Sequence, residues 1–308
     1  MINLRYRQKG TPVHALNPFA KLAWVASIFV LSLLFNHPVY LLLLFLATLP
    51  LIIAARIWRQ WVSLMKFTLY LCLAIIIINA LVSSHGVHLL WQAPFQLPLV
   101  GTPAITLEAI FFGAGMCLRL LAIISAFALL TFTVHPDDIM LAMLKMKLPY
   151  KSVLAISLST RFIPTLIEDA ARISDVQRSR GLELDRGRLT QRLKSRMAII
   201  IPLLSNSLDR TVQVAEAMEA RAFGSGQKRS FYKEIALKRP DIPALIMGLI
   251  PLLLGIFIWW RGMGDYQYYP AMARLGFTSL EGTLLALLIL SLCLMLPLGL
   301  ARKGTEVD

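Results

Sequence analysis

The chain has 308 residues, of which 57% are hydrophobic, and its 31 Lys and Arg against 17 Asp and Glu give a formal net charge of +14. Soluble domains are about 45–50% apolar, so this composition excludes an ordinary water-soluble protein and favours one embedded in a membrane. Cytoplasmic loops of membrane proteins gather Lys and Arg, and we therefore expect a lipid bilayer, and not nucleic acid, to account for the basic charge.

Three apolar runs open the chain. The first two, about 22–35 and 39–55, are separated by Asn36-His37-Pro38 and predict a helical hairpin. Asn17-Pro18 predicts the start of the first helix, because Pro fits the first helical turn. A third run, about 62–83, follows two cations and two Trp, which are typical of a membrane interface.

The loop at about 84–104 is predicted to lie outside the cell. No Lys or Arg occurs between Lys66 and Arg119, and cytoplasmic loops are the ones that collect these residues. His85 and His88 in this loop form an H-x-x-H pair. Solvated loop residues are the favoured interpretation, because no third metal ligand accompanies them.

A fourth apolar run, about 104–134, contains Arg119. A cation inside a membrane span is costly and is taken as functional by default. A buried structural pair or a contact to backbone carbonyls is the alternative, and both interpretations stay open. Gly113-Ala114-Gly115 offers a surface of small residues where another helix can approach closely, and packing within the chain is favoured over a subunit interface.

Residues 135–240 differ in character, because they hold 19 of the 31 basic and 11 of the 17 acidic residues yet keep an apolar helical period. This pattern predicts a folded segment on the cytosolic side. A helix from about 152 to Arg180 is expected to kink at Pro164. An i,i+4 ion pair between Glu168 and Arg172 is expected on its surface.

A turn-rich polar piece from Glu183 to Lys194 is expected to precede a second amphipathic helix, from about Pro202 to Arg221. The spacing of its apolar residues predicts one continuous face. That face consists of Leu204, Leu208, Ala215, Met218 and Ala222.

Two further apolar runs, about 243–260 and 281–300, close the chain. The fold class is therefore predicted as an all-α integral membrane protein, with about six transmembrane helices plus cytosolic amphipathic helices, and with the N- and C-termini in the cytoplasm. Three parts are expected: an N-terminal membrane domain (1–134) with about four transmembrane helices, a cytosolic domain of amphipathic helices (135–240) and a C-terminal transmembrane hairpin (241–308).

Sequence features of catalysis or metal binding are weak. Asp137-Asp138 is the only pair of adjacent Asp residues, and Gly224 to Ser230 lacks the spacing of a phosphate-binding loop. The three cysteines are interpreted as small core residues. We expect no catalytic residue, no metal site and no cofactor on this chain.

Two triplets, Ser179-Arg180-Gly181 and Ala220-Arg221-Ala222, end the two cytosolic helices. An Arg at the end of a surface helix presents a planar fork of donors that suits carboxylates on a partner. Two equivalent ends fit a partner that is itself a dimer. The alternative is that both are ordinary basic helix ends favoured by the helix dipole.

Several stretches together carry a resemblance to a known family. They are Asn17-Pro18-Phe19-Ala20-Lys21, Arg161-Phe162-Ile163-Pro164, Arg178-Ser179-Arg180-Gly181 and Ala217 to Gly224. With them the chain resembles, over about 1–240, the transmembrane T component of energy-coupling factor transporters. These transporters are a branch of the ATP-binding-cassette importers, and the family includes the cobalt-transport permease subunit.

The resemblance implies a coupling subunit in a prokaryotic cytoplasmic membrane, in which the cytosolic amphipathic helices of residues 135–240 are coupling helices that form a coupling-helix domain. Two ATP-binding-cassette ATPase subunits, which hold ATP and Mg, would each receive one helix end, with Arg180 and Arg221 in their grooves. A separate membrane subunit, the S component, would bind a vitamin, a vitamin precursor or a transition metal ion, so substrate choice would not be encoded in this chain.

Two departures from the family pattern stand out. Ala222 occupies a position where the family usually has Gly, and two spans follow residue 240 where one is expected. Two other functions stay open as alternatives. A self-contained secondary transporter would show internal repeats and several ionisable residues at mid-membrane, and a membrane enzyme of lipid or prenyl transfer would cluster acids or His at one membrane face.

Overall fold

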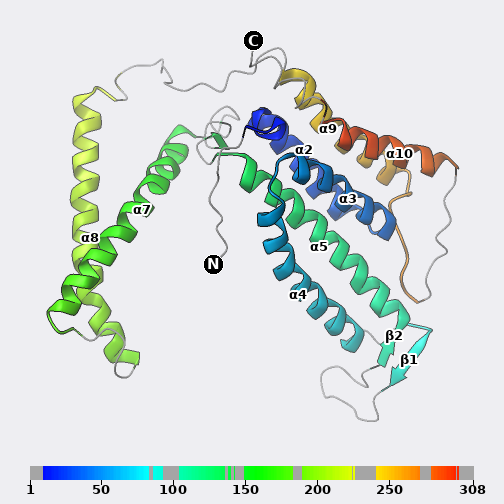
Figure 1. Ribbon diagram of the computed structural model, residues 1–308, viewed down its shortest axis with the longest axis horizontal. Helices are drawn as coiled ribbons and strands as arrows, with labels where there is room; N and C mark the ends of the chain where they lie inside the picture. Colours follow the sequence, from blue (N-terminus) through cyan, green and yellow to red (C-terminus); the bar gives the residue numbers. More distant parts are fainter. Residues whose placement is uncertain are drawn as a thin grey trace. The chain divides into compact units, whose positions relative to one another are not determined.

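The computed structural model is almost entirely helical over the residues that it describes (Figure 1). The structure describes residues 10–82, 86–92, 104–135, 138–139, 142, 149–182, 189–223, 225, 241–270, 279–295 and 297. The helices are α1 (Pro12–Ala15), α2 (Pro18–Leu34), α3 (Pro38–Ala54), α4 (Trp58–Val82), α5 (Leu107–Thr133), α7 (Tyr150–Ser179), α8 (Leu189–Ala220), α9 (Asp241–Trp260) and α10 (Ser279–Cys293). The prediction of an all-α membrane protein is confirmed.

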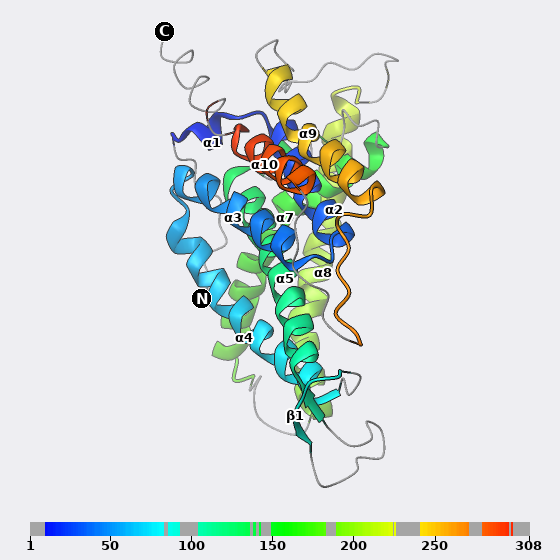
Figure 2. The same cartoon turned by 90° about the vertical axis from the view of Figure 1, so that its right-hand side faces the viewer.

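A small antiparallel sheet interrupts the predicted outer loop. Strand β1 (Leu89–Gln92) pairs with β2 (Ala104–Thr106), and Figures 1 and 2 show the two strands at the start of α5. His88 next to β1 directs its Nδ1 to the Glu108 carboxylate at 2.7 Å. His85 lies outside the described residues. Within the described chain, no group of three or more His, Cys, Asp or Glu is placed to hold a metal ion.

Three helices, α4, α5 and α9, are long and apolar enough to cross a membrane. The apolar helices α2, α3 and α10 are shorter, with 17, 17 and 15 residues. Each of the six predicted apolar runs therefore forms a helix among the described residues. The number of membrane crossings, about six, stays a prediction.

Local capping explains where the first hairpin begins and turns. Asn17 Oδ1 accepts a hydrogen bond from the Phe19 amide at 3.1 Å, with Pro18 in the first turn. His37 Nδ1 accepts from the Val39 amide at 3.3 Å, with Pro38 in the first turn of α3. Side-chain acceptors at the N-cap satisfy amides that have no partner inside the helix. The predicted helix start at Asn17-Pro18 and the predicted break at Asn36-His37-Pro38 are both confirmed.

The chain divides into two compact units, residues 1–139 with 236–308, and residues 140–235. The first contains α1 to α5 with α9 and α10, and the second contains α7 and α8. The predicted three-part division at residues 134 and 240, which assigns each part to a side of the membrane, stays a prediction.

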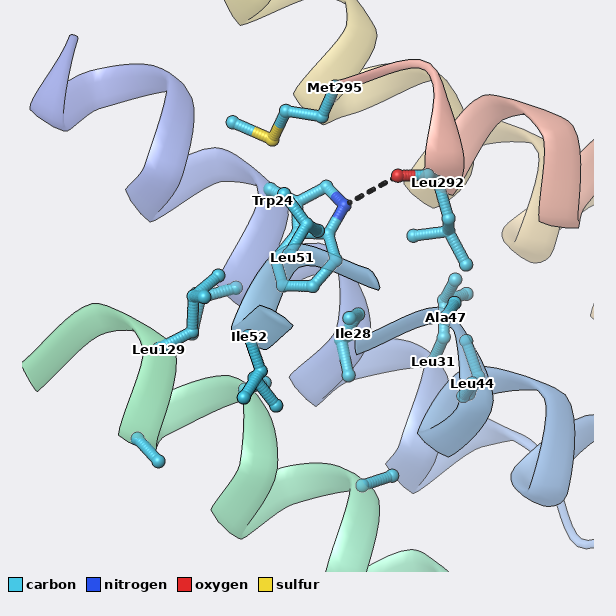
Figure 3. Packing of buried hydrophobic residues seen from close by; sticks show 14 of the residues in the cluster. Trp24, Ile28, Leu31, Leu44, Ala47, Leu51, Ile52, Leu129, Leu292 and Met295 are labelled. Carbon is cyan, nitrogen blue, oxygen red and sulfur yellow. Dashed lines mark hydrogen bonds between the residues drawn. The ribbon is translucent and has the colours of Figure 1, made fainter. Parts of the chain in front are cut away.

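Helix α2 contributes several residues to the buried hydrophobic cluster of the first unit, among them Trp24, Ile28 and Leu31 (Figure 3). Trp24 is fully buried, and its Nε1 donates to the Leu292 carbonyl at 3.3 Å. Gly248 lets α9 approach closely, because a Cβ there would lie 3.0 Å from the Ala20 oxygen. A Cβ at Gly255, two turns further along α9, would collide with Leu31. Of the two closing helices, whose role the sequence left open, α9 thus packs along α2, and α10 contacts α2 through the Trp24 hydrogen bond.

Lys21 ties the start of α2 to the end of α5. The side chain is only 2% exposed, and its Nζ donates to the carbonyls of His14 at 3.1 Å and Thr133 at 3.0 Å. Thr133 is the last residue of α5, where carbonyls lack partners inside the helix. Lys21 belongs to the basic, polar start of the sequence, and in the structure it is a buried residue that caps the C-terminal end of α5.

Candidate docking site on the helix pair α7 and α8

The end of α7 is a Schellman cap with Arg180 as its C-cap residue. Gly181 has a φ of +81° and donates its N–H to the Arg178 carbonyl at 3.0 Å. The Leu182 N–H donates to the Gln177 carbonyl at 3.0 Å. These two bonds define the motif, and the left-handed residue in it is usually Gly because it needs a positive φ. The predicted stop at Gly181 is confirmed.

The end of α8 has the same geometry around Arg221. Ala222 has a φ of +54° and donates its N–H to the Glu219 carbonyl at 2.8 Å. The Phe223 N–H donates to the Met218 carbonyl at 2.9 Å. Ala in place of Gly therefore leaves the cap type unchanged, although an L-residue in this conformation costs about 1–2 kcal/mol.

The backbone geometry alone does not single out these two ends. Helix α9 also ends on an Arg and a Gly, because Gly262 has a φ of +74° and Arg261 precedes it. The difference lies in the Arg side chains. The Arg261 guanidinium lies 5.2 Å from the centre of the Phe257 ring. Arg180 and Arg221 contact no hydrogen-bond or ion-pair partner among the described residues.

All six residues of the two triplets are exposed. The Ser179 hydroxyl donates to the Val176 carbonyl at 2.8 Å, so this side chain bonds within its own helix. Arg180 and Arg221 are therefore the groups of the triplets that offer hydrogen-bond donors to another molecule. The role of the six residues in docking stays a prediction.

Helices α7 and α8 cross in an antiparallel pair, as Figure 1 shows. Arg210 on α8 contacts Thr165 and Asp169 on α7, whereas Ala198, earlier on α8, contacts Gln177, later on α7. The two Arg-bearing ends consequently lie at opposite ends of the pair. At a rise of about 1.5 Å per residue, the helix segments from the Arg210 contact to the two ends together measure about 40 Å.

Helix α8 begins at Leu189, thirteen residues before its predicted start at Pro202, so that start was wrong. Residues 189–194 of the predicted turn-rich piece are helical instead, and the rest of that piece, residues 183–188, lies outside the described residues. Pro202 lies inside the helix and has no N–H to donate to the Ala198 carbonyl. Gln177 Nε2 supplies a donor to that carbonyl from α7, at 3.5 Å. A side chain of the neighbouring helix thus replaces part of what Pro202 removes.

Pro164 lies within α7, which continues through it from Tyr150 to Ser179. The proline breaks the ladder of backbone bonds at this point, because it cannot donate to the carbonyl four residues earlier. The predicted kink at Pro164 stays a prediction.

The expected ion pair between Glu168 and Arg172 was wrong, since neither side chain has an ion-pair partner in the described chain. Asp169 pairs across to α8 instead.

An apolar stripe on α8 is exposed. Its members recur every three or four residues and are each about half exposed or more: Leu193, Met197, Ile201, Leu204, Leu208 and Val212. Leu204 and Leu208 belong to the apolar face predicted from the sequence. On α7, Leu166, Ala170 and Ile173 are only partly exposed. An exposed apolar stripe of this length is typical of a surface that contacts another protein or a membrane.

Arg119 lies in the other unit, on α5. Its Nη2 donates to the Phe35 carbonyl at 3.0 Å and to Asn36 Oδ1 at 2.7 Å. Asn36 Nδ2 in turn donates to Asp265 Oδ1 at 2.9 Å. These contacts, one of them to a carbonyl, link the α2–α3 turn to the segment after α9 and favour the structural interpretation of Arg119.

Gly113 and Gly115 serve packing within the chain. A Cβ on Gly113 would lie 3.2 Å from the Ile76 Cα of α4, and one on Gly115 would lie 2.5 Å from the Tyr268 hydroxyl oxygen. The Tyr268 hydroxyl donates to the Asn36 carbonyl at 2.9 Å. The small residues thus admit α4 on one side and Tyr268 on the other.

Comparison with known proteins decides the family. The family model described as cobalt transport protein (CbiQ) matches residues 9–232. The chain belongs to this family. It is 31% identical over 264 residues to the energy-coupling factor transporter transmembrane protein EcfT of Streptococcus equi subsp. equi, covering 83% of this chain and 94% of that protein. The proteins of the same name from Staphylococcus aureus and Streptococcus thermophilus are 29% and 30% identical, over 82% and 80% of this chain and 95% of each relative.

Membership of the CbiQ family confirms the resemblance to the transmembrane component of energy-coupling factor transporters. The chain is thus a membrane transport protein of this type. The match to the family model includes α7, α8 and both triplets, and it ends before α9 begins. The contacts of Arg119 through Asn36 to Asp265 therefore reach into the part of the chain beyond the match.

Sequence reasoning missed the residues that hold the helix pair together. Arg210 and Gln177 carry no local signal, because their partners lie on another helix. One hint was available, since Thr165 and Asp169 are one turn apart and share a face of α7. A single Arg fork on a neighbouring helix can contact such a pair.

Proposed function

We propose that this chain is the coupling subunit of an energy-coupling factor importer. It would transmit ATP-driven movement of two ATPase subunits to a separate substrate-binding membrane subunit. The observation that carries the proposal is the pair of matched helix ends, in which Arg180 and Arg221 occupy the same position in the same cap. Both side chains are exposed and lack a partner among the described residues.

The separation of the two ends fits two docking points. Each guanidinium can donate two parallel bonds to a carboxylate on a partner. With about 40 Å of helix between the ends, one small partner does not reach both, whereas two copies of an ATPase subunit can each receive one. Closure of the two copies on ATP would then move the helix pair that carries both ends. A transition of this kind needs an element with two arrangements that ATP biases.

ATP and Mg are assigned to the ATPase subunits, and this chain is proposed to be non-catalytic and to hold no cofactor. We place it in a prokaryotic cytoplasmic membrane with both termini and the helix pair on the cytoplasmic side. The excess of Lys and Arg in residues 135–240 supports this orientation.

The substrate-binding S component is the proposed occupant of the apolar stripe on α8. A membrane subunit has apolar surface to offer at the bilayer boundary, and the stripe offers a matching surface from Leu193 to Val212. The proposed cargo is a vitamin, a vitamin precursor or a transition metal ion, in keeping with the family's range. The choice among these belongs to the S component.

Arg180→Ala and Arg221→Ala, singly and together, test the docking. The complex is purified through a tag on this chain, and the ATPase subunits that copurify are quantified together with substrate uptake. Each single variant is expected to weaken assembly, and the double variant to abolish it. Arg172→Ala is the matched control, because Arg172 is an exposed Arg of α7 away from the tip. Unimpaired assembly and uptake in Arg180→Ala, in Arg221→Ala and in the double variant would refute the proposal.

A further inference from the structure

The contact between Arg210 and α7 joins the two helices at a special point. Arg210 Nη1 donates to Thr165 Oγ1 at 2.9 Å, and Nη2 donates to Asp169 Oδ2 at 2.9 Å. Asp169 is only 17% exposed, so this ion pair is partly shielded from water. The guanidinium therefore spans one turn of α7, with one nitrogen on each acceptor, a geometry that Lys cannot reproduce.

The turn that Arg210 contacts begins directly after Pro164. Because Pro164 interrupts the backbone ladder of α7, the helix can bend there most easily. Arg210 binds the segment that follows, which ends in the Arg180 cap. The same Arg210 belongs to α8, which ends in the Arg221 cap.

A second contact keeps the crossing from pivoting about Arg210. Gln177 Nε2 donates to the Ala198 carbonyl, and Gln177 lies about 18 Å along α7 from Thr165 at 1.5 Å per residue. Two contacts this far apart define the angle between two helices, whereas one contact leaves it variable. Each contact involves a proline. Thr165 directly follows Pro164 in α7, and the Ala198 carbonyl is the one to which Pro202 in α8 cannot donate.

We infer that Arg210 is a positioning residue that, with Thr165 and Asp169, locks α7 beyond Pro164 to α8, so that the two Arg-bearing ends move as one body. The inference rests on the proposed function, because the proposed function gives the two Arg-bearing ends a shared task. Without the lock, an ATPase subunit on one end would bend its own helix and leave the other end in place. Docking would survive, and the transfer of movement would not.

Arg210→Met tests the lock in the assembled complex, in a background where Cys72, Cys117 and Cys293 are replaced by Ala. Spin labels at Asp175→Cys on α7 and Glu216→Cys on α8, both exposed sites, report the distribution of distances between the helices. The expected result is a broader distribution, unchanged copurification of the ATPases and a fall in substrate taken up per ATP hydrolysed of at least about fivefold, the lower end of typical coupling between sites.

Charge reversal separates a lock from a general effect on folding. Asp169→Arg combined with Arg210→Glu restores an opposite pair across the helices and is expected to recover the narrow distribution and much of the uptake per ATP. Arg172→Met removes an exposed Arg of α7 and should leave both measurements unchanged. An unaltered distribution or unaltered uptake per ATP in Arg210→Met would overturn the inference.

The distance measurement does not depend on how the ATPases bind. If Arg180→Ala with Arg221→Ala leaves assembly intact, the docking proposal fails while the spin-label distances still report the lock. If instead docking behaves as proposed and the distances stay narrow in Arg210→Met, the lock alone fails.

Discussion

Ala222 holds the same left-handed backbone conformation as Gly181, with a φ of +54° against +81°. Both residues follow an Arg at the C-cap, and both close the same pair of backbone hydrogen bonds. A Gly at the second triplet would therefore meet a backbone requirement that Ala meets only at a cost in free energy.

Ala222→Gly is expected to stabilise the end of α8. Removal of the Cβ relieves about 1 kcal/mol of backbone strain, and hydrogen exchange of the Phe223 amide should slow by about fivefold. Gly181→Ala should speed exchange of the Leu182 amide by a similar factor, although a Cβ there meets open space. Gly282→Ala is the control, since Gly282 also faces open space but lies within α10 without a positive φ. Faster exchange in Ala222→Gly would contradict the strain.

The parts of the fold that sequence could predict are those decided locally. Asn17-Pro18 and His37-Pro38 start helices through a side-chain acceptor and a proline that are adjacent in the chain. The ends at Gly181 and Ala222 likewise follow from residues within one turn. Each pattern could be interpreted without knowing what packs against it.

The parts that sequence could not predict depend on distant partners. Pro202 was interpreted as a helix start, yet it lies inside α8, where Gln177 of another helix donates to the Ala198 carbonyl. Lys21 belongs to the basic, polar start of the sequence, but its Nζ bonds to the end of α5, 112 positions later in the chain, and its side chain is buried. Arg119 likewise finds its acceptor Asn36 across 83 positions.

Lys21→Met is expected to destabilise the membrane unit. Met fills a similar volume but donates no hydrogen bond, so the carbonyls of His14 and Thr133 lose a buried donor. A buried polar group left without its partner costs about 1–3 kcal/mol. Thermal unfolding of the purified full-length chain in detergent should therefore shift to lower temperature. Lys66→Met, at an exposed site of α4, should leave the transition in place; equal shifts in the two variants would argue against the cap.

Gly115→Ala and Tyr268→Phe should be non-additive. The Cβ of Gly115→Ala would lie 2.5 Å from the Tyr268 hydroxyl oxygen and push it away from the Asn36 carbonyl. Tyr268→Phe loses that hydrogen bond, worth about 1 kcal/mol, but removes the atom that the Cβ meets. In a double-mutant cycle of unfolding free energies, the double variant should lose less than the sum of the single losses. Strict additivity would show that the two side chains do not interfere.

The turn between α2 and α3 should make stability depend on pH. Burial lowers the pKa of His37 from its usual value near 6.5, and the nearby Glu281 opposes this shift only in part. The rings of Tyr40 and Tyr266 also pack against His37. His37 Nδ1 caps α3 by accepting from the Val39 amide, which the protonated ring cannot do.

Because the folded chain resists protonation of His37, the unfolded chain binds more protons below about pH 6.5, and stability must fall as pH decreases through that range. Unfolding temperatures measured between pH 7.5 and pH 5 should decrease accordingly. His37→Asn keeps a side-chain acceptor at the N-cap and has no titratable group, so it should flatten this part of the profile. A profile unchanged by His37→Asn would assign the dependence to another group.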